Sequence, residues 1–297
     1  GAPPECALQV FAEPQVQAGL RERLPRPQVF NEDFHVELIN ARRVRHFNAP
    51  GLIQETSHSF TASVNSDFNS RASLHELLVE GFYTLLQNPF ADEFFELDTL
   101  GSWGYRRINA EEDAYVRGVN VEWNSFWGDR LSSQLGLTMQ QSRYHSPQAW
   151  GEGEESVTTQ FVRTPDTYGY ATLEWATFEH FTTALTFNYT GSMWVPHFGL
   201  DPDTEDPAER AALENGDVIA GERLERSEQF LITDLLFTYE LHLTRETNLE
   251  LFAGVKNIFN QLQKNHDRGM FRDAGYIYGP CQPRTFNFGI RIGNSLR

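Results

Sequence analysis

Apolar and polar residues alternate along much of this chain with a period of two. Between residues 181 and 194 ("FTTALTFNYTGSMW"), one set of alternating positions is mainly aromatic or aliphatic, and the other is mainly hydroxyl or amide. Successive side chains of a β-strand point to opposite sides of a sheet. This segment is therefore predicted to be a strand with one oily face and one polar face.

The same alternation predicts further strands and no long helix. They span residues 58–68, 75–86, 115–124, 131–144, 170–176, 231–243, 248–260 and 284–292, and residues 15–24 are a further candidate. Together with residues 181–194, they amount to about ten strands. We therefore expect an all-β protein. In the loop at 195–227, the segment "PAERAALE" is predicted to form a short helical turn.

Short and long connections alternate along the predicted strands. Short turns such as "SDFNSRA", "NSFWGDR", "TFEH" and "TRET" are separated by long linkers at about 88–102, 145–166, 195–227 and 261–282. A soluble sandwich does not require this alternation. An outer-membrane barrel does, because its short turns lie at the periplasmic rim and its long loops at the extracellular rim. We therefore expect an antiparallel transmembrane β-barrel.

The distribution of aromatic residues favours the barrel over a soluble β-sandwich or propeller, which would alternate as well. Aromatic side chains gather near strand ends, as a girdle at the membrane interface requires. Examples are Trp123, Phe126, Trp175, Phe178 and Trp194. The predicted strands also exceed the usual five or six residues of soluble sheets. The aromatic face is then expected to contact lipid, and the polar face to line a hydrated lumen.

Composition narrows the function classes. The formal net charge is −17, with 41 acidic and 24 basic residues. This balance argues against nucleic-acid binding, which needs a basic surface. No apolar run reaches the roughly 18 residues of a membrane helix. The two cysteines, Cys6 and Cys281, have no metal-motif spacing, and whether they form a disulfide is left open.

Several segments resemble the C-terminal half of the barrel of TonB-dependent outer-membrane receptors. They are "RPQVFNEDFH" (26–35), "GLIQETSHSF" (51–60), "YVRGVNVEW" (115–123), "RTPDTYGYATLEW" (163–175), "YTGSMWVPH" (189–197), "LELFAGVKNIFNQLQ" (249–263) and "RDAGYIYGPCQPRTFNFGIRI" (272–292). They cover residues 20 to 292 approximately, in the order of the family. One departure is the terminal "GNSLR", where the family commonly stops at an aromatic residue.

The resemblance implies that residues 1–297 are the last strands, about ten, of a barrel of about 22 strands. It implies a lipid bilayer around the barrel and a Gram-negative outer membrane as the location. It further implies an N-terminal plug that contacts TonB, neither of which is expected in these residues. The implied activity is uptake of a scarce nutrient, an iron chelate (siderophore) or cobalamin, with energy relayed by TonB.

Two loops contain candidate sites. The closing loop and the loop at 195–227 offer residues that would meet a ligand at the mouth of the lumen: His197, Arg268, Arg272, Asp273, Tyr276 and Tyr278. The alternative is packing and ion pairing between loops. A second group supplies closely spaced oxygen ligands for Ca²⁺, although EF-hand spacing is missing: Asp201, Asp203, Glu205 and Asp206. A solvated acidic loop is the alternative.

Other function classes remain open at this point. No nucleophile elbow, phosphate loop or zinc motif occurs, so we expect no enzyme and no cofactor beyond the candidate Ca²⁺. A passive pore or a surface-adhesion barrel is the main alternative to active transport. An outer-membrane hydrolase is another, and the sequence does not identify the transported ligand.

Overall fold

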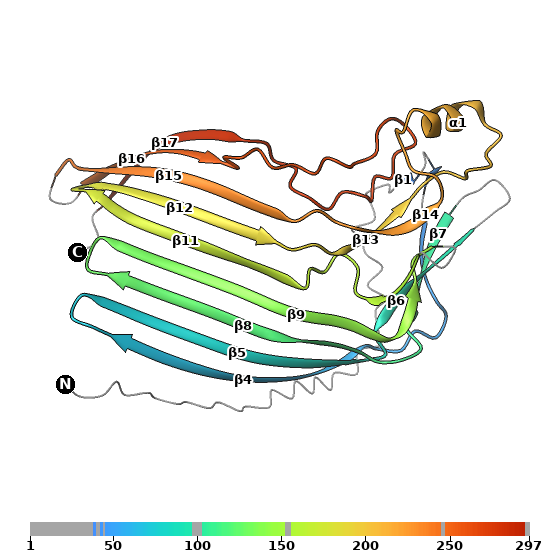
Figure 1. Cartoon of the computed structure of the whole chain (residues 1–297), viewed down its shortest axis with the longest axis horizontal. Helices are drawn as coiled ribbons and strands as arrows, with labels where there is room; N and C mark the ends of the chain where they lie inside the picture. The colour runs from blue at the N-terminus through green and yellow to red at the C-terminus, as the bar shows by residue number, and fades with distance from the viewer. Residues whose placement is uncertain are drawn as a thin grey trace.

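A 10-stranded antiparallel sheet dominates the computed structural model (Figure 1). The structure describes residues 38–39, 42–43, 45–96, 103–151, 156–244 and 247–294. The strands follow one another in chain order across the sheet: β4 (Thr56–Asn69), β5 (Ser73–Gln87), β8 (Ala114–Trp127), β9 (Leu131–Ala149), β11 (Thr167–Phe178), β12 (Phe181–Thr190), β15 (Phe230–His242), β16 (Thr247–Lys256) and β17 (Thr285–Asn294), with β10 (Val157–Gln160) beside β9. Within these residues the sheet stays open, with β4 and β17 as its edges. The predicted all-β class is confirmed.

Smaller elements gather at one end of the sheet (Figure 1). A three-stranded sheet contains β3 (Arg45–Asn48), β6 (Phe90–Glu96) and β7 (Trp103–Asn109), a hairpin pairs β13 (Trp194–Phe198) with β14 (Glu222–Arg226), and β1 (Leu38–Ile39) pairs with β2 (Arg42–Arg43). The helix α1 (Pro207–Glu214) confirms the helical turn predicted at "PAERAALE". Asp206 starts this helix, because its side chain accepts a hydrogen bond from the backbone N–H of Ala208 at 2.7 Å.

The predicted alternation of short and long connections is present. Residues 70–72, 128–130, 179–180 and 243–246 form the short connections, and residues 88–113, 150–166, 191–229 and 257–284 form the long ones. The long linkers contain more structure than the sequence predicts, because β6, β10, β13, β14 and the end of β9 lie inside them. The strand predicted at 181–194 ends at Thr190 instead, where Gly191 still donates to the carbonyl oxygen of Thr167 and the chain then leaves the sheet.

One face of the sheet carries an uncovered apolar surface. Phe288 is 87% exposed, Phe237 is 37% exposed, and Phe187 is half-buried. Among the described residues no second sheet covers these side chains, as a soluble sandwich would require. The aromatic positions predicted to contact lipid therefore lie on a face that is open to the surroundings. No helix in the described part of the chain has the length and apolar character needed to cross a membrane.

On the opposite face, aromatic rings cover glycines of the adjacent strand. Three directly paired positions share this arrangement: Phe82 with Gly118, Tyr170 with Gly136, and Phe252 with Gly289. A Cβ atom at each of these glycines would overlap the ring. The rings can therefore lie close to the sheet only because the paired residue has no side chain.

Buried residues are concentrated at the end with the long loops. One apolar cluster contains Ala91, Ala110, Ala114 and Tyr144, and another contains Met193, Val195 and Tyr276. A single-layered sheet has no second layer against which to bury its side chains. The loop end, where hairpins and loops pack over one another, is therefore where the structure offers an enclosed environment for polar chemistry.

Candidate functional site

The hairpin β13–β14 presents one face to the last long loop, residues 257–284. In the hairpin register His197 pairs with Arg223, and Val195 pairs with Glu225. Because alternate residues of a strand share a face, these four side chains lie on the same side of the hairpin. Val195 is fully buried there, and only 2% of His197 is exposed. The hairpin thus carries a histidine and its polar neighbours into an enclosed position.

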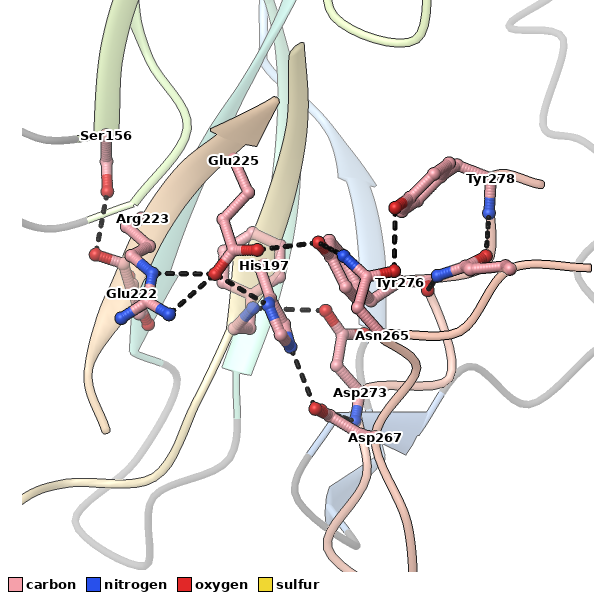
Figure 2. A network of polar contacts seen from close by, with 12 residues as sticks. Ser156, His197, Glu222, Arg223, Glu225, Asn265, Asp267, Asp273, Tyr276 and Tyr278 are labelled. Atoms are coloured by element: carbon pink, nitrogen blue, oxygen red, sulfur yellow. Dashed lines mark hydrogen bonds and ion pairs between the residues drawn. The ribbon is translucent and has the colours of Figure 1, made fainter. Parts of the chain in front are cut away.

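His197 lies between two carboxylates (Figure 2). Its Nε2 is 3.0 Å from Oδ1 of Asp267, a hydrogen bond between residues 70 positions apart. Its Nδ1 is 3.4 Å from Oε1 of Glu225, within ion-pair distance but without the alignment of a hydrogen bond. Burial lowers the pKa of His197, but the two carboxylates outweigh that effect and the net pKa is raised. The arrangement therefore favours the imidazolium form.

Tyr276 completes the contact between hairpin and loop. Its ring stacks on the imidazole of His197, with centroids 3.5 Å apart and planes 3° apart. Its hydroxyl donates to Oε2 of Glu225 at 2.7 Å. Burial, followed by the negative charge of Glu225, raises the pKa of Tyr276. The tyrosine therefore stays neutral and acts as a hydrogen-bond donor.

The carboxylate of Glu225 is surrounded by three side chains that stabilise its ionised form: His197, Tyr276 and Arg223. The largest influence on its pKa is the interaction with His197, and burial opposes it. Donation from Tyr276 and from Arg223, whose Nη2 lies 2.6 Å from Oε1, adds to the first effect. The pKa of Glu225 is lowered to about 2 as a result. Glu225 is therefore ionised at any physiological pH and holds the hairpin face together.

Asp273 binds backbone groups from both elements. Its Oδ2 accepts from the N–H of Phe198 in β13 at 3.1 Å, and its Oδ1 accepts from the N–H of Gly275 at 2.7 Å. Its own N–H donates to Oδ2 of Asp267 at 2.9 Å. Burial raises the pKa of Asp273 in spite of these hydrogen bonds. We refer to His197, Arg223, Glu225, Asp267, Asp273 and Tyr276 as the His197 cluster.

A second set of polar contacts fixes the loop around the His197 cluster. Nδ2 of Asn265 donates to the hydroxyl of Tyr276 at 3.0 Å, and the hydroxyl of Tyr278 donates to Oδ1 of Asn265 at 2.7 Å (Figure 2). Gln263, itself buried, donates to the carbonyl oxygen of Tyr276 and accepts from the N–H groups of Tyr278 and Gly279. Hydrogen bonds therefore hold the segment from 263 to 279 in one conformation, in addition to its contacts with the hairpin.

Asn257 anchors the same loop to the end of the sheet. Its Nδ2 donates to the carbonyl oxygens of Gln261 at 2.8 Å and Gln282 at 2.9 Å, which lie near the two ends of the loop. Its Oδ1 accepts from the N–H of Gln261. Its φ of 49° is left-handed, a conformation that asparagine tolerates better than most residues. One buried amide thus holds both ends of the loop.

A cavity of about 290 Å³ lies beside the His197 cluster. Asp267 and Asp273 form part of its wall, but their oxygens are already engaged as described above. Exposed His266 and Arg272 also line it, and Nη1 of Arg272 donates to the carbonyl oxygen of Gly269. The remaining walls are mainly apolar: Leu262, Ile277 and Pro280 with Gln263 and Cys281. The cavity therefore offers a guanidinium group next to an apolar surface.

The structure brings together three of the six residues proposed from sequence for a ligand. His197, Asp273 and Tyr276 meet in the His197 cluster, where they are buried and join the hairpin to the last long loop. Arg272 lines the cavity. Arg268 is exposed, and its N–H donates to the carbonyl oxygen of Asp217. Tyr278 lies beside the His197 cluster and is connected to it by its hydrogen bond to Asn265. Their role in ligand binding stays a prediction.

Sequence reasoning missed Glu225 and Gln263. Glu225 belongs to "ERLER", which pairs with "WVPHF" in the structure, and only this pairing places it beside His197. In that pairing Arg223 and Glu225 share the face that carries His197, and a buried histidine needs such carboxylate partners. Gln263 carries no comparable signal, because its three hydrogen bonds all go to backbone groups.

The four acidic residues proposed for Ca²⁺ lie between β13 and α1. Asp201 accepts from the N–H of Asp203 at 2.9 Å, and Asp206 caps α1, so both serve the loop backbone. Asp201, Asp203 and Asp206 are exposed, while Glu205 is also on the loop surface. In the residues that the structure describes, no group of three or more histidine, cysteine or acidic side chains is arranged to hold a metal. Calcium binding stays a prediction.

Whether the two cysteines form a disulfide stays open. Cys281 is exposed, lines the cavity and forms no disulfide with a described residue. Cys6 lies outside the described residues.

Comparisons with known proteins support the fold. The chain is similar to OprC, a copper transporter, at 13% identity and a TM-score of 0.54, over 84% of this chain and 33% of that one. It is similar to FpvAI in its complex with pyocin S2 at 10% identity and a TM-score of 0.50, over 82% and 28% of the two chains. The FrpB iron transporter from Neisseria meningitidis aligns at 13% identity and a TM-score of 0.49, over 85% and 32%.

The chain thus spans roughly a third of the length of these solved structures. At such identities, the likeness establishes the fold alone. No curated protein matches the sequence. The family model described as "TonB dependent receptor-like, beta-barrel" matches residues 26–258, which is well over half of the chain. The resemblance noted from the sequence is therefore confirmed, and the chain belongs to the TonB-dependent receptors of the Gram-negative outer membrane, as part of their β-barrel.

Proposed function

We propose that the complete receptor imports a scarce metal as a chelate, with energy relayed by TonB through the plug. The first candidate for this cargo is an iron chelate of the siderophore type. Membership of the receptor family supports the transport role. The copper transporter OprC, which shares the fold, also has a metal as its cargo. None of the similar structures named above concerns cobalamin, so we propose a metal chelate rather than cobalamin as the cargo.

The observation that carries the proposal is the cavity beside the His197 cluster. The loop that lines it is held at both ends by Asn257 and in the middle by His197, so its shape is set before a ligand arrives. Preorganised loops bind more tightly because less conformational entropy is lost on binding. A volume of about 290 Å³ suits one lobe of a chelate rather than the whole of it.

Charge suggests how the chelate is recognised. The carboxylate oxygens in the wall are engaged by His197 and by backbone N–H donors, whereas Arg272 is exposed and donates to a single carbonyl oxygen. A guanidinium group with free N–H donors fits a carboxylate or a similar anionic oxygen pair. We therefore propose that Arg272 contacts an anionic group of the chelate while Leu262 and Ile277 contact its apolar part.

Uptake of a radiolabelled iron chelate by cells that carry the complete receptor tests this. We expect uptake to require TonB, and Arg272→Gln to raise the half-saturating concentration roughly tenfold, the value of one charge-assisted hydrogen bond. Lys264→Gln is the matched control, because Lys264 is exposed in the same loop and does not line the cavity. Uptake without TonB would refute active transport, and an unchanged Arg272→Gln variant would refute the assigned site.

A further inference from the structure

The lipid-facing side of the sheet contains a hollow with a cation at its edge. A hollow of about 830 Å³ is lined by residues from β4, β5, β8, β9 and β11. Gly81 and Ala62 pair with each other, and a Cβ atom at Gly81 would meet nothing within 4 Å, so open space lies above them. Their side of the sheet is the aromatic one, because Phe60 and Val119 share it. We call this region the lipid-face hollow.

The walls of the lipid-face hollow are mainly apolar and exposed. Phe60 is 57% exposed and Met139 is 48% exposed, with Tyr83 and Val119 between them. A branched acyl lipid would find an apolar floor and apolar sides there. A single acyl chain that fits into such a depression makes more van der Waals contacts than it would on a flat barrel wall.

Arg117 is the cation of the hollow. Its Nε and Nη2 donate to Oε1 of Gln141 at 3.1 and 2.8 Å, and its guanidinium lies 5.1 Å from the ring centroid of Tyr115. Among the described residues, no carboxylate forms an ion pair with it. Asp166 also lines the hollow, but Arg143 pairs with it at 3.1 Å. The hollow therefore has one uncompensated positive charge, held in a fixed orientation with N–H donors left over.

The position along β8 places Arg117 at the outer membrane boundary. Trp127 lies at the short-turn end of the strand, on the same face and ten residues away. Ten residues span roughly 34 Å at about 3.4 Å each, which corresponds to roughly 24–28 Å along the membrane normal for a tilt of about 35–45°. The apolar band of such barrels is about 25 Å high. Arg117 is thus at the level of the outer-leaflet headgroups, beside Tyr83 and Tyr115, whose rings stack at 6.3 Å.

From these observations we propose that the lipid-face hollow binds one phosphate-bearing lipid of the outer leaflet. Arg117, held by Gln141, receives the phosphate, and an acyl chain lies over Gly81 and Ala62 between Phe60, Val119 and Met139. Arginine suits this role because its planar donors match two oxygens of one phosphate. The inference is independent of the cargo of the receptor.

Native mass spectrometry of the complete receptor in mild detergent tests the proposal. The probes are the diphosphorylated lipid anchor of lipopolysaccharide, the same lipid without phosphates, and inorganic phosphate. We expect the wild-type protein to retain the phosphorylated lipid and Arg117→Gln to weaken its binding roughly tenfold or more. Arg71→Gln is the matched control, since Arg71 is exposed in the short turn at the opposite membrane boundary.

A second variant tests the apolar part without changing charge. Gly81→Leu should fold, because its side chain enters open space, and we expect it to fill the hollow and weaken lipid binding severalfold. Heat-modifiability on gels checks that each variant remains folded. The phosphate contact is overturned if Arg117→Gln binds the lipid as wild type does, if Arg71→Gln loses binding equally, or if the lipid without phosphates binds equally well. The apolar contact is overturned if folded Gly81→Leu binds unchanged. Displacement of the lipid by inorganic phosphate at equal concentration would also overturn the proposal.

Discussion

Replacing His197 by alanine should release the last long loop, residues 257–284, from the hairpin β13–β14. The imidazole is 2% exposed and stands between Asp267 and Glu225, at 3.0 and 3.4 Å. Without it, Asp267 keeps a buried charge with no cation beside it, whereas Glu225 retains Arg223 at 2.6 Å. Breaking a buried ion pair on one side costs about 3–5 kcal/mol.

The surviving pair of Glu225 and Arg223 places the expected cost near the lower end of that range. Loss of the stacked contact with Tyr276 adds about 0.5–1.5 kcal/mol. We therefore expect about 3–4 kcal/mol for the docking of the loop. At about 1.4 kcal/mol for each factor of ten, the open fraction rises roughly 10²- to 10³-fold.

Hydrogen–deuterium exchange of the complete receptor measures this opening. The amides to follow are those of Asp273, Gly275 and Tyr276, because each donates a hydrogen bond inside the docked loop. Amides of β16 serve as the internal reference. His242→Ala is the control, because His242 is exposed at the end of β15 that leads into a short turn.

A double variant separates charge from packing. If the uncompensated charge of Asp267 causes most of the loss, adding Asp267→Asn to His197→Ala should recover about 1–2 kcal/mol of protection, since a neutral amide costs less to bury. Exchange rates in His197→Ala that rise less than threefold would refute the reasoning. So would a double variant that exchanges faster than the single one.

The remaining predictions concern pH, backbone space and individual hydrogen bonds. The pKa of His197 is raised above 6.5, so its contribution to docking is complete below pH 6.5 and is lost as the pH rises through the raised pKa. The pKa of Glu225 is lowered from 4.5 to about 2, so its contribution is present above pH 4.5 and is lost as the pH falls towards 2. Amide exchange of the loop should therefore be slowest between about pH 4.5 and 6.5 after correction for intrinsic rates, and a flat profile would contradict this. Gly118→Ala should lower the gel-shift unfolding temperature, because its Cβ would overlap the backbone oxygen of Met139 and the ring of Phe82, at a cost of about 1–3 kcal/mol, whereas Gly81→Ala should not; equal shifts would refute the assignment. Asn257→Ala should increase proteolysis of residues 257–284, since two carbonyl oxygens lose their donor at about 1–3 kcal/mol each, and unchanged cleavage would argue against the anchor. Tyr276→Phe should lower the free energy of opening of the loop by about 1–2 kcal/mol, because the hydrogen bond to Glu225 is lost, and the same loop amides should exchange faster. Unaltered exchange would argue against that bond.

Most of the sheet was predictable from the sequence because its pattern is local. A residue in a strand points to the side opposite its neighbour whatever the rest of the chain does, so 181–190 already contained the two faces seen in β12. The alternation of connection lengths is local as well. The helix α1 followed from a cap, a proline and a short run of helix formers, all within one segment.

The hairpin β13–β14 was not predictable in this way. Residues 195–198 are buried on both sides, so the period of two that marks a half-exposed strand is missing there. The predicted strand end at Trp194 was wrong because the alternation in the sequence continues past Thr190, where β12 ends, although Met193 already packs in the loop region.

The sequence by itself determined the strands, their lipid-facing and polar faces, and the family, because these depend on short periods and on segments in a fixed order. Only the tertiary structure decided that His197 meets Asp267 and Tyr276, which lie about 70–80 residues further along the chain. Neither histidine nor aspartate marks its partner in the sequence. The partnership arises because two long loops of one rim are packed together, and burial there makes an unpaired charge too costly to keep.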